Sequence, residues 1–505
     1  MPPTWTAWSA RRGARLAATA LAFAVVVACS SASGPREERA PASPSTGASG
    51  GDLAWEACGG GFECTVLEVP LVEGDPAQGT VPLALTRLPA ADRVNRVGSI
   101  VVNPGGPGLS AVDHLQAAWT STLPVVRERF DLVAFDPRAV GRSSPLRCAS
   151  TAELDRYFAL DPTPDGPDEL TALAQGAGAL ATACARGAGR LLGHLSTAAA
   201  VGDLEAVRVA VGDERLTYLG YSYGTTIGAG YLDRFPDRVR AMVLDSPIPA
   251  SLTWDEVLTG QAVGFERALS AFLADCARTA CAFHRVVGGD LDVAYDRLLA
   301  SVEDAPLPGD RTRTVGPGEA FLGVIAALYD QDSGWPALAA ALAAAAQGDG
   351  TPLLALADGY LGRGLEGYST VSEANLAVSC SDRPWPDDPG AYDALGQRLA
   401  ERAPRFGRAV ALAGLSCAAW PAKPDAVPAP VTGEGAPPVL VLGTTGDPAT
   451  PYAWAVELAG RLDDAVLLTA RGQEHTVYDV DGPSCVVEAV DAYLLTLEVP
   501  EPVRC

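Results

Sequence analysis

One pentapeptide constrains the fold of this chain more than any other feature of its sequence. Residues 220–224 read G-Y-S-Y-G and match the pattern G-x-S-x-G. The apolar run 216–220 predicts a buried strand before the serine, and residues 225–235 have helical periodicity after it. In that context the chain turns sharply from strand to helix, which lifts the serine hydroxyl out of the sheet. We therefore expect Ser222 to be a nucleophile, although a tight glycine turn with a capping serine would match the same letters.

A serine needs a neighbouring base to become a useful nucleophile at neutral pH, and histidine has the most suitable pKa. The chain has four candidates: His114, His194, His284 and His475. The strand–serine–helix turn is typical of the α/β-hydrolase fold, in which the chain order is serine, acid, histidine. His114 and His194 come before Ser222 in the chain. His284 lies within residues 251–430, which we interpret as a helical cap outside the sheet domain. We expect His475, in a loop after the predicted strand 465–469, to be the base.

The base in turn needs a carboxylate that fixes its tautomer and stabilises the imidazolium. Asp447 follows the predicted strand 438–443 and lies between Ser222 and His475 in the chain. Its alternative role is to cap the helix that follows. Asp245 is the rival acid, because it ends the core strand before Asp447. We favour Asp447 as the third catalytic residue.

An acyl-transfer site also needs two backbone N–H donors directed at the developing oxyanion. One is expected from Tyr223, the residue after the nucleophile. The other is expected from the loop 103–108, N-P-G-G-P-G, which follows the predicted strand 98–102. Glycines there let the backbone approach a substrate, so Gly106 is the first candidate and Gly105 the second. A purely structural turn is the alternative for this loop.

Strands and helices alternate through most of the chain, which indicates an α/β fold with a mostly parallel sheet flanked by helices. Residues 251–430 break the alternation, since they hold alanine-rich helical stretches and no buried-strand run. We interpret them as a mainly helical cap inserted into the sheet domain. The predicted organisation is therefore a signal peptide (1–28), a flexible tether (29–54), a first part of the α/β-hydrolase core (55–250), the helical cap (251–430) and the rest of the core (431–505).

The first residues are typical of an export signal. Three arginines precede the apolar run 16–28, which is too short to span a bilayer. The run ends V-V-A-C at residues 26–29 and resembles a bacterial lipoprotein cleavage box, in which Cys29 would be lipidated. An ordinary signal peptide cut nearby is the alternative. We expect an exported protein, either anchored to the cell membrane through Cys29 or extracellular.

Cysteine usage and charge agree with export. Of 11 Cys, ten remain without Cys29, enough for five disulfides in an oxidising compartment. The cysteine spacing indicates no metal site, and we expect no cofactor. The net charge is −24, and removing residues 1–28 with their three Arg would make it −27, which argues against nucleic acid and anionic lipid as partners. Sequence leaves the disulfide pairing open, and nearest-neighbour pairing would give Cys58–Cys64, Cys148–Cys184, Cys276–Cys281, Cys380–Cys417 and Cys485–Cys505.

The nucleophile turn, the glycine-rich loop, the segments around Asp447 and His475 and several shorter segments together resemble the secreted tripeptidyl aminopeptidases of the α/β-hydrolases. These enzymes are relatives of the proline iminopeptidases. The resemblance runs from about residue 55 to 505 and implies release of short peptides from free N-termini, without metal or cofactor. It also implies Ser222, Asp447 and His475 as the triad. The matching segments are 103–108, 135–138, 141–143, 203–208, 220–225, 235–236, 243–245, 380–382, 417–421, 446–451, His475 and Cys485.

Two positions depart from the family pattern without removing a reacting group. Ala139 and Glu474 stand where the family usually has glycine. Glu474 puts an acid beside His475, which could raise the pKa of that histidine or contribute to substrate binding. An aminopeptidase must recognise an ammonium group, normally with a carboxylate. Asp382, Glu373 and Glu474 are the candidates, and a solvated acid is the alternative for each.

The leading hypothesis is a serine exopeptidase acting on peptides with free N-termini through a Ser222 acyl-enzyme. An esterase or amidase of small molecules with the same triad is the alternative within enzymes, because fold and triad do not determine the substrate. A lipid-anchored binding protein with an inactive site is the alternative from another class.

Overall fold

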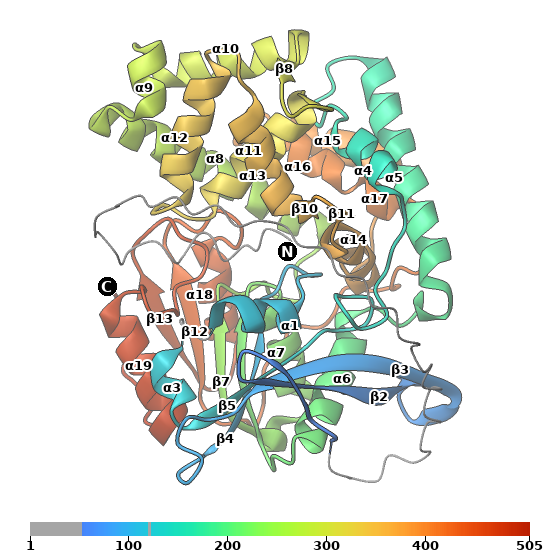
Figure 1. Ribbon diagram of the computed structural model, residues 1–505, viewed down its shortest axis with the longest axis vertical. Helices are drawn as coiled ribbons and strands as arrows, with labels where there is room; N and C mark the ends of the chain where they lie inside the picture. The colour runs from blue at the N-terminus through green and yellow to red at the C-terminus, as the bar shows by residue number, and fades with distance from the viewer. Residues whose placement is uncertain (1–52, 120–122) are drawn as a thin grey trace, which may run out of the picture.

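The structure is a computed structural model that describes residues 53–119 and 123–505 (Figure 1). The predicted signal peptide, the lipidation site Cys29 and the tether as far as residue 52 lie outside these residues. Within the described ranges, no helix combines the length and the apolar character that a membrane crossing requires.

A nine-stranded sheet forms the base of the molecule (Figure 1). Its strand order is β1-β2-β3-β5-β4-β6-β7-β12-β13; β1, β2 and β3 pair antiparallel, β3 joins β5 antiparallel, and every pair from β5 to β13 is parallel. The predicted α/β-hydrolase class with a mostly parallel sheet is confirmed. The strands are β1 (Glu56–Gly59), β2 (Phe62–Val72), β3 (Asp75–Leu88), β4 (Gly98–Asn103), β5 (Phe130–Phe135), β6 (Leu216–Tyr221), β7 (Val239–Asp245), β12 (Val439–Thr444) and β13 (Ala465–Ala470).

Helices cover both faces of the sheet. Helices α6, α7 and α18 share one core cluster with it, and α1, α3 and α19 share another. Because both faces are covered, the central strands bury nearly all their residues, which explains their continuous apolar runs. The helices are α1 (Ala111–His114), α3 (Pro124–Arg127), α6 (Thr197–Ala210), α7 (Gly224–Arg234), α18 (Tyr452–Arg461) and α19 (Ser484–Thr496), with short turns η2 (Leu115–Trp119), η3 (Gly189–Leu191) and η4 (Pro236–Arg238).

The strand order locates the functional edge of the sheet. The strands β5 and β6 lie on opposite sides of β4, so the direction of winding reverses there. Ligands of open α/β sheets bind at such a switch point, outside the carboxyl ends of the strands. At this point Asn103, the last residue of β4, is in register with Gly220 of β6. The glycine-rich loop after β4 and the serine after β6 therefore emerge side by side.

A layer of helices lies beyond this edge (Figure 1). It shares one large apolar cluster, to which α4 (Thr151–Phe158) and α5 (Pro167–Ala188) also contribute from the chain between β5 and β6. The sequence pattern did not indicate these two helices, and the boundaries of the proposed cap stay a prediction. The remaining elements are α8 (Trp254–Thr279), α9 (Ala282–Val287), α10 (Leu291–Asp304), β8 (Leu307–Pro308), β9 (Thr314–Val315), α11 (Pro317–Leu328), α12 (Gly334–Ala345), α13 (Thr351–Leu361), β10 (Arg363–Gly364), β11 (Gly367–Tyr368), α14 (Val371–Asp382), α15 (Pro389–Leu399), α16 (Gly407–Ala413) and α17 (Leu415–Ala418).

The ten cysteines among the described residues form five disulfides, and the nearest-neighbour pairing is the one present. Two of them, Cys148–Cys184 and Cys380–Cys417, link segments of the helical layer that are 36 and 37 residues apart. Among the described residues, no group of three or more His, Cys, Asp or Glu side chains is arranged to hold a metal ion.

Candidate active site

The predicted nucleophile stands on a sharp turn between β6 and α7. Ser222 has φ +53°, in the left-handed region that residues with a side chain rarely adopt. A Cβ on Gly220 would lie 2.6 Å from the carbonyl oxygen of Gly224, and a Cβ on Gly224 would lie 2.6 Å from that of Asn103. Only glycine fits at both positions, so the local sequence dictates this turn. The Ser222 side chain remains partly exposed at its apex.

The loop after β4 runs directly against this turn. A Cβ on Gly105 would lie 2.5 Å from the carbonyl oxygen of Tyr221 and 2.9 Å from the backbone nitrogen of Tyr223. The Gly105 N–H donates to Asn103 Oδ1 at 2.9 Å. The N–H groups of Gly106 and Tyr223, in contrast, have no acceptor among the described residues. Both N–H groups are therefore available to an oxyanion, whereas that of Gly105 is already used.

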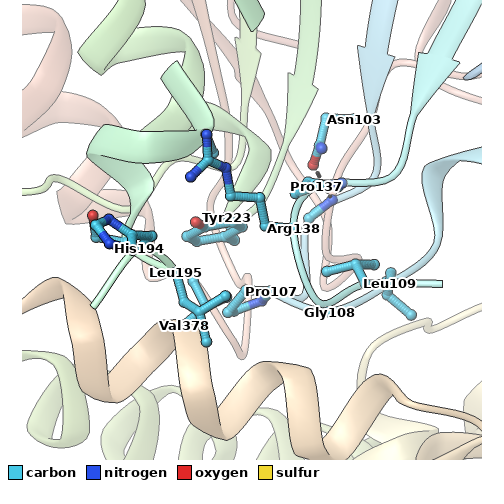
Figure 2. Close-up of a pocket in the computed structure, with 14 residues that line it drawn as sticks. Asn103, Pro107, Gly108, Leu109, Pro137, Arg138, His194, Leu195, Tyr223 and Val378 are labelled. Carbon is cyan, nitrogen blue, oxygen red and sulfur yellow. Dashed lines mark hydrogen bonds between the residues drawn. The ribbon is translucent and has the colours of Figure 1, made fainter. Parts of the chain in front are cut away.

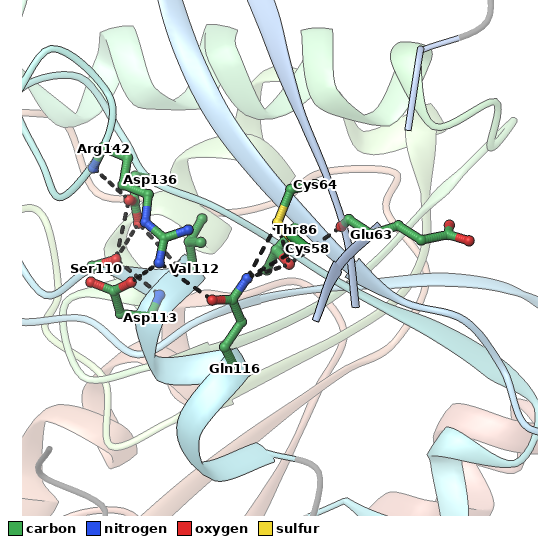
Figure 3. A network of polar contacts seen from close by, with 10 residues as sticks. All are labelled: Cys58, Glu63, Cys64, Thr86, Ser110, Val112, Asp113, Gln116, Asp136 and Arg142. Atoms are coloured by element: carbon green, nitrogen blue, oxygen red, sulfur yellow. Dashed lines mark hydrogen bonds and ion pairs between the residues drawn. A yellow bond between two sulfur atoms is a disulfide. The ribbon is translucent and has the colours of Figure 1, made fainter. Parts of the chain in front are cut away.

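A buried acid anchors the far end of the same loop (Figure 3). Asp136, the residue after β5, accepts hydrogen bonds from the Ser110 hydroxyl and from the Val112 and Arg142 backbone N–H groups. Its carboxylate is fully buried, and burial raises its pKa to about 6. Arg142 extends this network to the Gln116 side chain, which donates to the disulfide sulfur of Cys64. The segment that follows the glycine-rich loop is thus tied to the residues after β5 and to Cys64 of β2.

The structure brings Asp447 and His475 together. Both carboxylate oxygens of Asp447 lie near His475 Nδ1, at 3.0 and 2.9 Å. Asp447 also accepts hydrogen bonds from the Ala449 and Thr450 N–H groups, and the Thr450 hydroxyl donates to it at 2.9 Å. Asp447 therefore closes a turn before α18 as well as contacting the histidine, and its side chain is only 1% exposed. Sequence reasoning missed Thr450, although it lies in the family segment 446–451.

The environment of His475 stabilises its protonated form. Burial by itself would lower the pKa of the imidazole, but the charge and hydrogen bonds of Asp447, with the charge of Asp245, raise it above 6.5. The groups that raise this pKa are Asp447 and Asp245, and a role of Glu474 beside the histidine stays a prediction. The His475 backbone N–H donates to the carbonyl oxygen of Tyr329, whose ring meets the imidazole edge-on at 5.3 Å between centroids. The helical layer thus contacts the histidine loop directly.

Asp245, the rival acid, holds the backbone of both catalytic loops. Its carbonyl oxygen accepts the Ser222 N–H at 2.9 Å. Its Oδ2 accepts the N–H groups of Val477 and Tyr478, both at 2.8 Å. The adjacent Ser246 hydroxyl accepts the Thr476 N–H at 3.1 Å. The serine turn and the histidine loop are therefore fastened to the same end of β7. No hydrogen bond joins Asp245 to the His475 ring, in contrast to Asp447.

The three acids proposed for ammonium binding lie in different environments. Glu373 is 2% exposed and accepts the backbone N–H groups of Cys148 and Ala149, so it is out of reach of a substrate. That expectation is corrected. Asp382 is half-buried, and each of its oxygens accepts one hydrogen bond from Thr197, which uses part of its hydrogen-bonding capacity. Glu474 stays half-buried, and burial raises its pKa, as do the charges of nearby Asp332 and Asp330. Glu474 and Asp382 therefore remain candidates, and Glu474 is the one next to His475 in the chain.

A small cavity lies behind the glycine-rich loop (Figure 2). The loop itself, Tyr223, Arg138, His194 and Val378 of α14 contribute to its lining. Its volume is about 10 Å³, the lower limit for one water molecule. The guanidinium of Arg138 pairs with buried Asp203 at 2.7 Å. The cavity is too small for a peptide, so we do not assign the substrate to it.

Known proteins resemble this chain over most of its length. The family described as "alpha/beta hydrolase fold" matches residues 98–285, and the family described as "TAP-like protein" matches residues 403–505. Serine protease Hip1 of Mycobacterium tuberculosis is 37% identical over 449 residues, which cover 86% of this chain and 85% of that protein. A protein of the same organism named carboxylesterase B is 36% identical over 452 residues, which cover 88% of this chain and 86% of that protein. The tripeptidyl aminopeptidase of Streptomyces lividans is 32% identical over 481 residues, which cover 91% of this chain and 88% of that protein.

These identities extend across the sheet domain and the helical layer together, so the likeness covers more than the common fold. The relatives carry the names of serine proteases, aminopeptidases and esterases, all of them hydrolases. A strained serine turn and a hydrogen-bonded Asp–His pair are parts that such chemistry uses. The chain therefore belongs to the tripeptidyl aminopeptidase-like family of α/β-hydrolases and is a serine hydrolase.

Proposed function

We propose that this protein is an exported serine exopeptidase that releases di- or tripeptides from free N-termini through an acyl-enzyme on Ser222. One observation carries the proposal: the hydrogen-bonded pair of Asp447 and His475 lies on loops fastened beside the strained Ser222 turn. Five disulfides support export, since such bonds persist in oxidising compartments.

In the proposed reaction His475 removes the proton from the Ser222 hydroxyl as its oxygen attacks the scissile carbonyl carbon. The N–H groups of Tyr223 and Gly106 bind the oxyanion of the tetrahedral intermediate. When the C–N bond breaks, His475 gives the proton to the leaving amine. A water molecule, deprotonated by the same histidine, then hydrolyses the ester. Asp447 stabilises the imidazolium in both steps.

Recognition of a free N-terminus needs an anionic group near the nucleophile. Glu474 is next to His475 in the chain and is half-buried, and Asp330 and Asp332 add negative charge close to it. We propose that Glu474 binds the substrate ammonium. The negative charge around it would favour a cation, and the desolvated carboxylate would bind it more strongly than an exposed one.

The test compares three substrates of the purified enzyme: a tripeptide anilide with a free amine, the same anilide with an acetylated amine, and a simple acyl ester. We expect fast hydrolysis of the free-amine peptide and at least a tenfold loss of kcat/KM on acetylation. Ser222→Ala should abolish turnover and labelling by a fluorophosphonate probe while the melting temperature stays close to that of the wild type. Equal rates for the free and acetylated anilides would refute the aminopeptidase assignment.

An esterase or amidase of small molecules is the second candidate. The relative named carboxylesterase B, 36% identical to this chain, favours it. The same triad would serve both reactions, because ester and amide cleavage share the tetrahedral intermediate. A preference for the simple ester over the free-amine anilide in the experiment above would support this candidate.

A further inference from the structure

Helix α14 of the helical layer contacts both segments that would form the oxyanion hole. Its first half packs on the glycine-rich loop after β4. A Cβ on Gly108 would lie 2.5 Å from the carbonyl oxygen of Val371 and 2.8 Å from the Asn375 nitrogen, so loop and helix backbones are in direct contact. The Asn375 side chain donates a hydrogen bond to the Pro107 carbonyl oxygen at 3.1 Å. That oxygen is one residue from the proposed donor Gly106.

Asp382, the last residue of α14, is linked through Thr197 to the side chain of Tyr223, whose backbone N–H is the other proposed oxyanion donor. Asp382 Oδ2 accepts a hydrogen bond from the Thr197 hydroxyl at 2.6 Å, and the Thr197 hydroxyl oxygen lies 2.7 Å from the Tyr223 hydroxyl. Since the Thr197 proton goes to the carboxylate, the Tyr223 hydroxyl donates to Thr197. Asp382 Oδ1 also accepts the Thr197 N–H at 2.6 Å, which fixes Thr197 itself. The ring of Tyr223 is thereby held from α14 through one threonine.

Between these two contacts the helix packs against the site. Val378 is 4% exposed and lines the small cavity together with Pro107 and Tyr223 (Figure 2). The helix itself is fastened by the Cys380–Cys417 disulfide and by the Ser381 hydroxyl, which accepts a hydrogen bond from Trp420 Nε1 at 3.1 Å. A rigid element therefore spans the two halves of the hole.

We propose that Asn375 and Asp382 are positioning residues that hold the two oxyanion donors, Gly106 and Tyr223, at their working separation. This inference rests on the proposed function, since it concerns the same site. Because both contacts come from one helix, the geometry of the hole depends on the position of the helical layer. The layer would then contribute to the rate of the chemical step as well as to substrate selection.

A purely structural role makes different predictions. Asp382 accepts the first N–H of α6, and Ser196 makes no side-chain cap there, so Asp382 could serve only to cap that helix. Replacing Asp382 would disturb both functions. Thr197→Val separates them, because it keeps the capped N–H and removes only the hydroxyl that leads to Tyr223. Thr197→Ser restores the hydroxyl.

The experiment measures kcat and KM of these variants with whichever substrate, free-amine anilide or ester, the wild-type enzyme hydrolyses faster. Loss of one donor costs on the order of 10²–10³ in kcat. Since the variants displace a donor without removing it, we expect about a tenfold fall in kcat for Thr197→Val and for Asn375→Leu. We expect KM to stay within about twofold, the signature of an interaction made only in the transition state. The affinity of a peptide boronate, whose adduct is tetrahedral, should fall about as much as kcat.

Two controls complete the design. Thr197→Ser should recover kcat to within about twofold of the wild type. Ser381→Ala loses the contact of α14 with Trp420 but no contact with the hole, so it should lower the melting temperature and leave kcat unchanged.

Three results would overturn the inference: wild-type kcat in both Thr197→Val and Asn375→Leu, failure of Thr197→Ser to recover kcat, or an equal loss in Ser381→Ala. A wild-type enzyme that does not react with a fluorophosphonate would instead refute Ser222 as nucleophile, and the inference with it. A reactive wild type with unaffected variants refutes the inference alone.

Discussion

Removal of the buried carboxylate of Asp245 should change both the stability of the protein and its catalysis. Its Oδ2 is the acceptor of two backbone N–H groups, those of Val477 and Tyr478, at 2.8 Å each, and the residue is fully buried. In Asp245→Ala both N–H groups lose their acceptor inside the protein. In Asp245→Asn one amide oxygen can still accept from both.

The magnitude follows from the two hydrogen bonds. A buried donor left without an acceptor costs about 1–3 kcal/mol, so Asp245→Ala should lower the free energy of unfolding by about 2–6 kcal/mol. With an unfolding entropy of about 2.1 cal/mol/K per residue over the roughly 450 described residues, that is a fall of about 2–6 °C in melting temperature. Asp245→Asn should lose about half as much, because a neutral acceptor binds about half as strongly as a charged one.

The effect of the Asp245 variants on catalysis follows from the negative charge that they remove. Burial raises the pKa of Asp245 to about 6, so above that pH it is ionised, and its charge contributes to the raised pKa of His475. Either variant removes this charge and lowers the pKa of His475. Since only the neutral imidazole is a base, the acidic limb of the profile of kcat/KM against pH should move to lower pH. Asp245→Ala should also lower kcat, because the histidine loop loses its attachment to β7.

The assay is differential scanning fluorimetry for melting, with kcat/KM measured from pH 5 to pH 9. Asp213→Ala is the control: Asp213 accepts the buried Ser99 N–H at 2.8 Å, at the end of β4 opposite to the site. It should lower the melting temperature and leave the pH profile unchanged. A wild-type melting temperature in Asp245→Ala, or a pH profile that does not move in either Asp245 variant, would refute the reasoning.

Four further predictions concern the same site and the helical layer. The acidic limb of wild-type kcat/KM should lie above pH 6.5, because Asp447 raises the pKa of His475 despite its burial; a limb at lower pH would contradict this. Asp447→Asn should reduce kcat by about 10⁴ and also lower the melting temperature, because Asp447 accepts the Ala449 and Thr450 N–H groups; a loss of kcat below tenfold would exclude the acid as the partner of the base. Glu474→Gln should raise KM for free-amine peptides and leave KM for a simple ester unchanged; an equal change for both substrates would remove it as the ammonium ligand. Replacing Cys380 and Cys417 with serine opens a loop of 37 residues and should lower the free energy of unfolding by about 4 kcal/mol, and an unchanged melting temperature would count against the pairing.

Local features of this chain could be predicted because their cause is local. The strand 98–102 was expected and is found as Gly98–Asn103, since a continuous apolar run fits a strand covered on both faces. The turn at Ser222 was expected because Gly220 and Gly224 leave room that no other residue leaves. Chain order requires an acid between Ser222 and His475, where both Asp245 and Asp447 stand, and the hydrogen bonds to His475 favour Asp447.

What depended on contacts between distant parts of the chain could not be predicted. Glu373 looked available to a substrate in the sequence, yet it is buried against Cys148 and Ala149, 225 and 224 residues away. The contacts of Asp245 with Val477 and Tyr478 span 232 and 233 residues. A carboxylate carries the same charge and hydrogen-bonding capacity wherever it stands in a sequence. Whether it binds a ligand or a backbone amide is decided by which segments the sheet order and the packed helices bring to it.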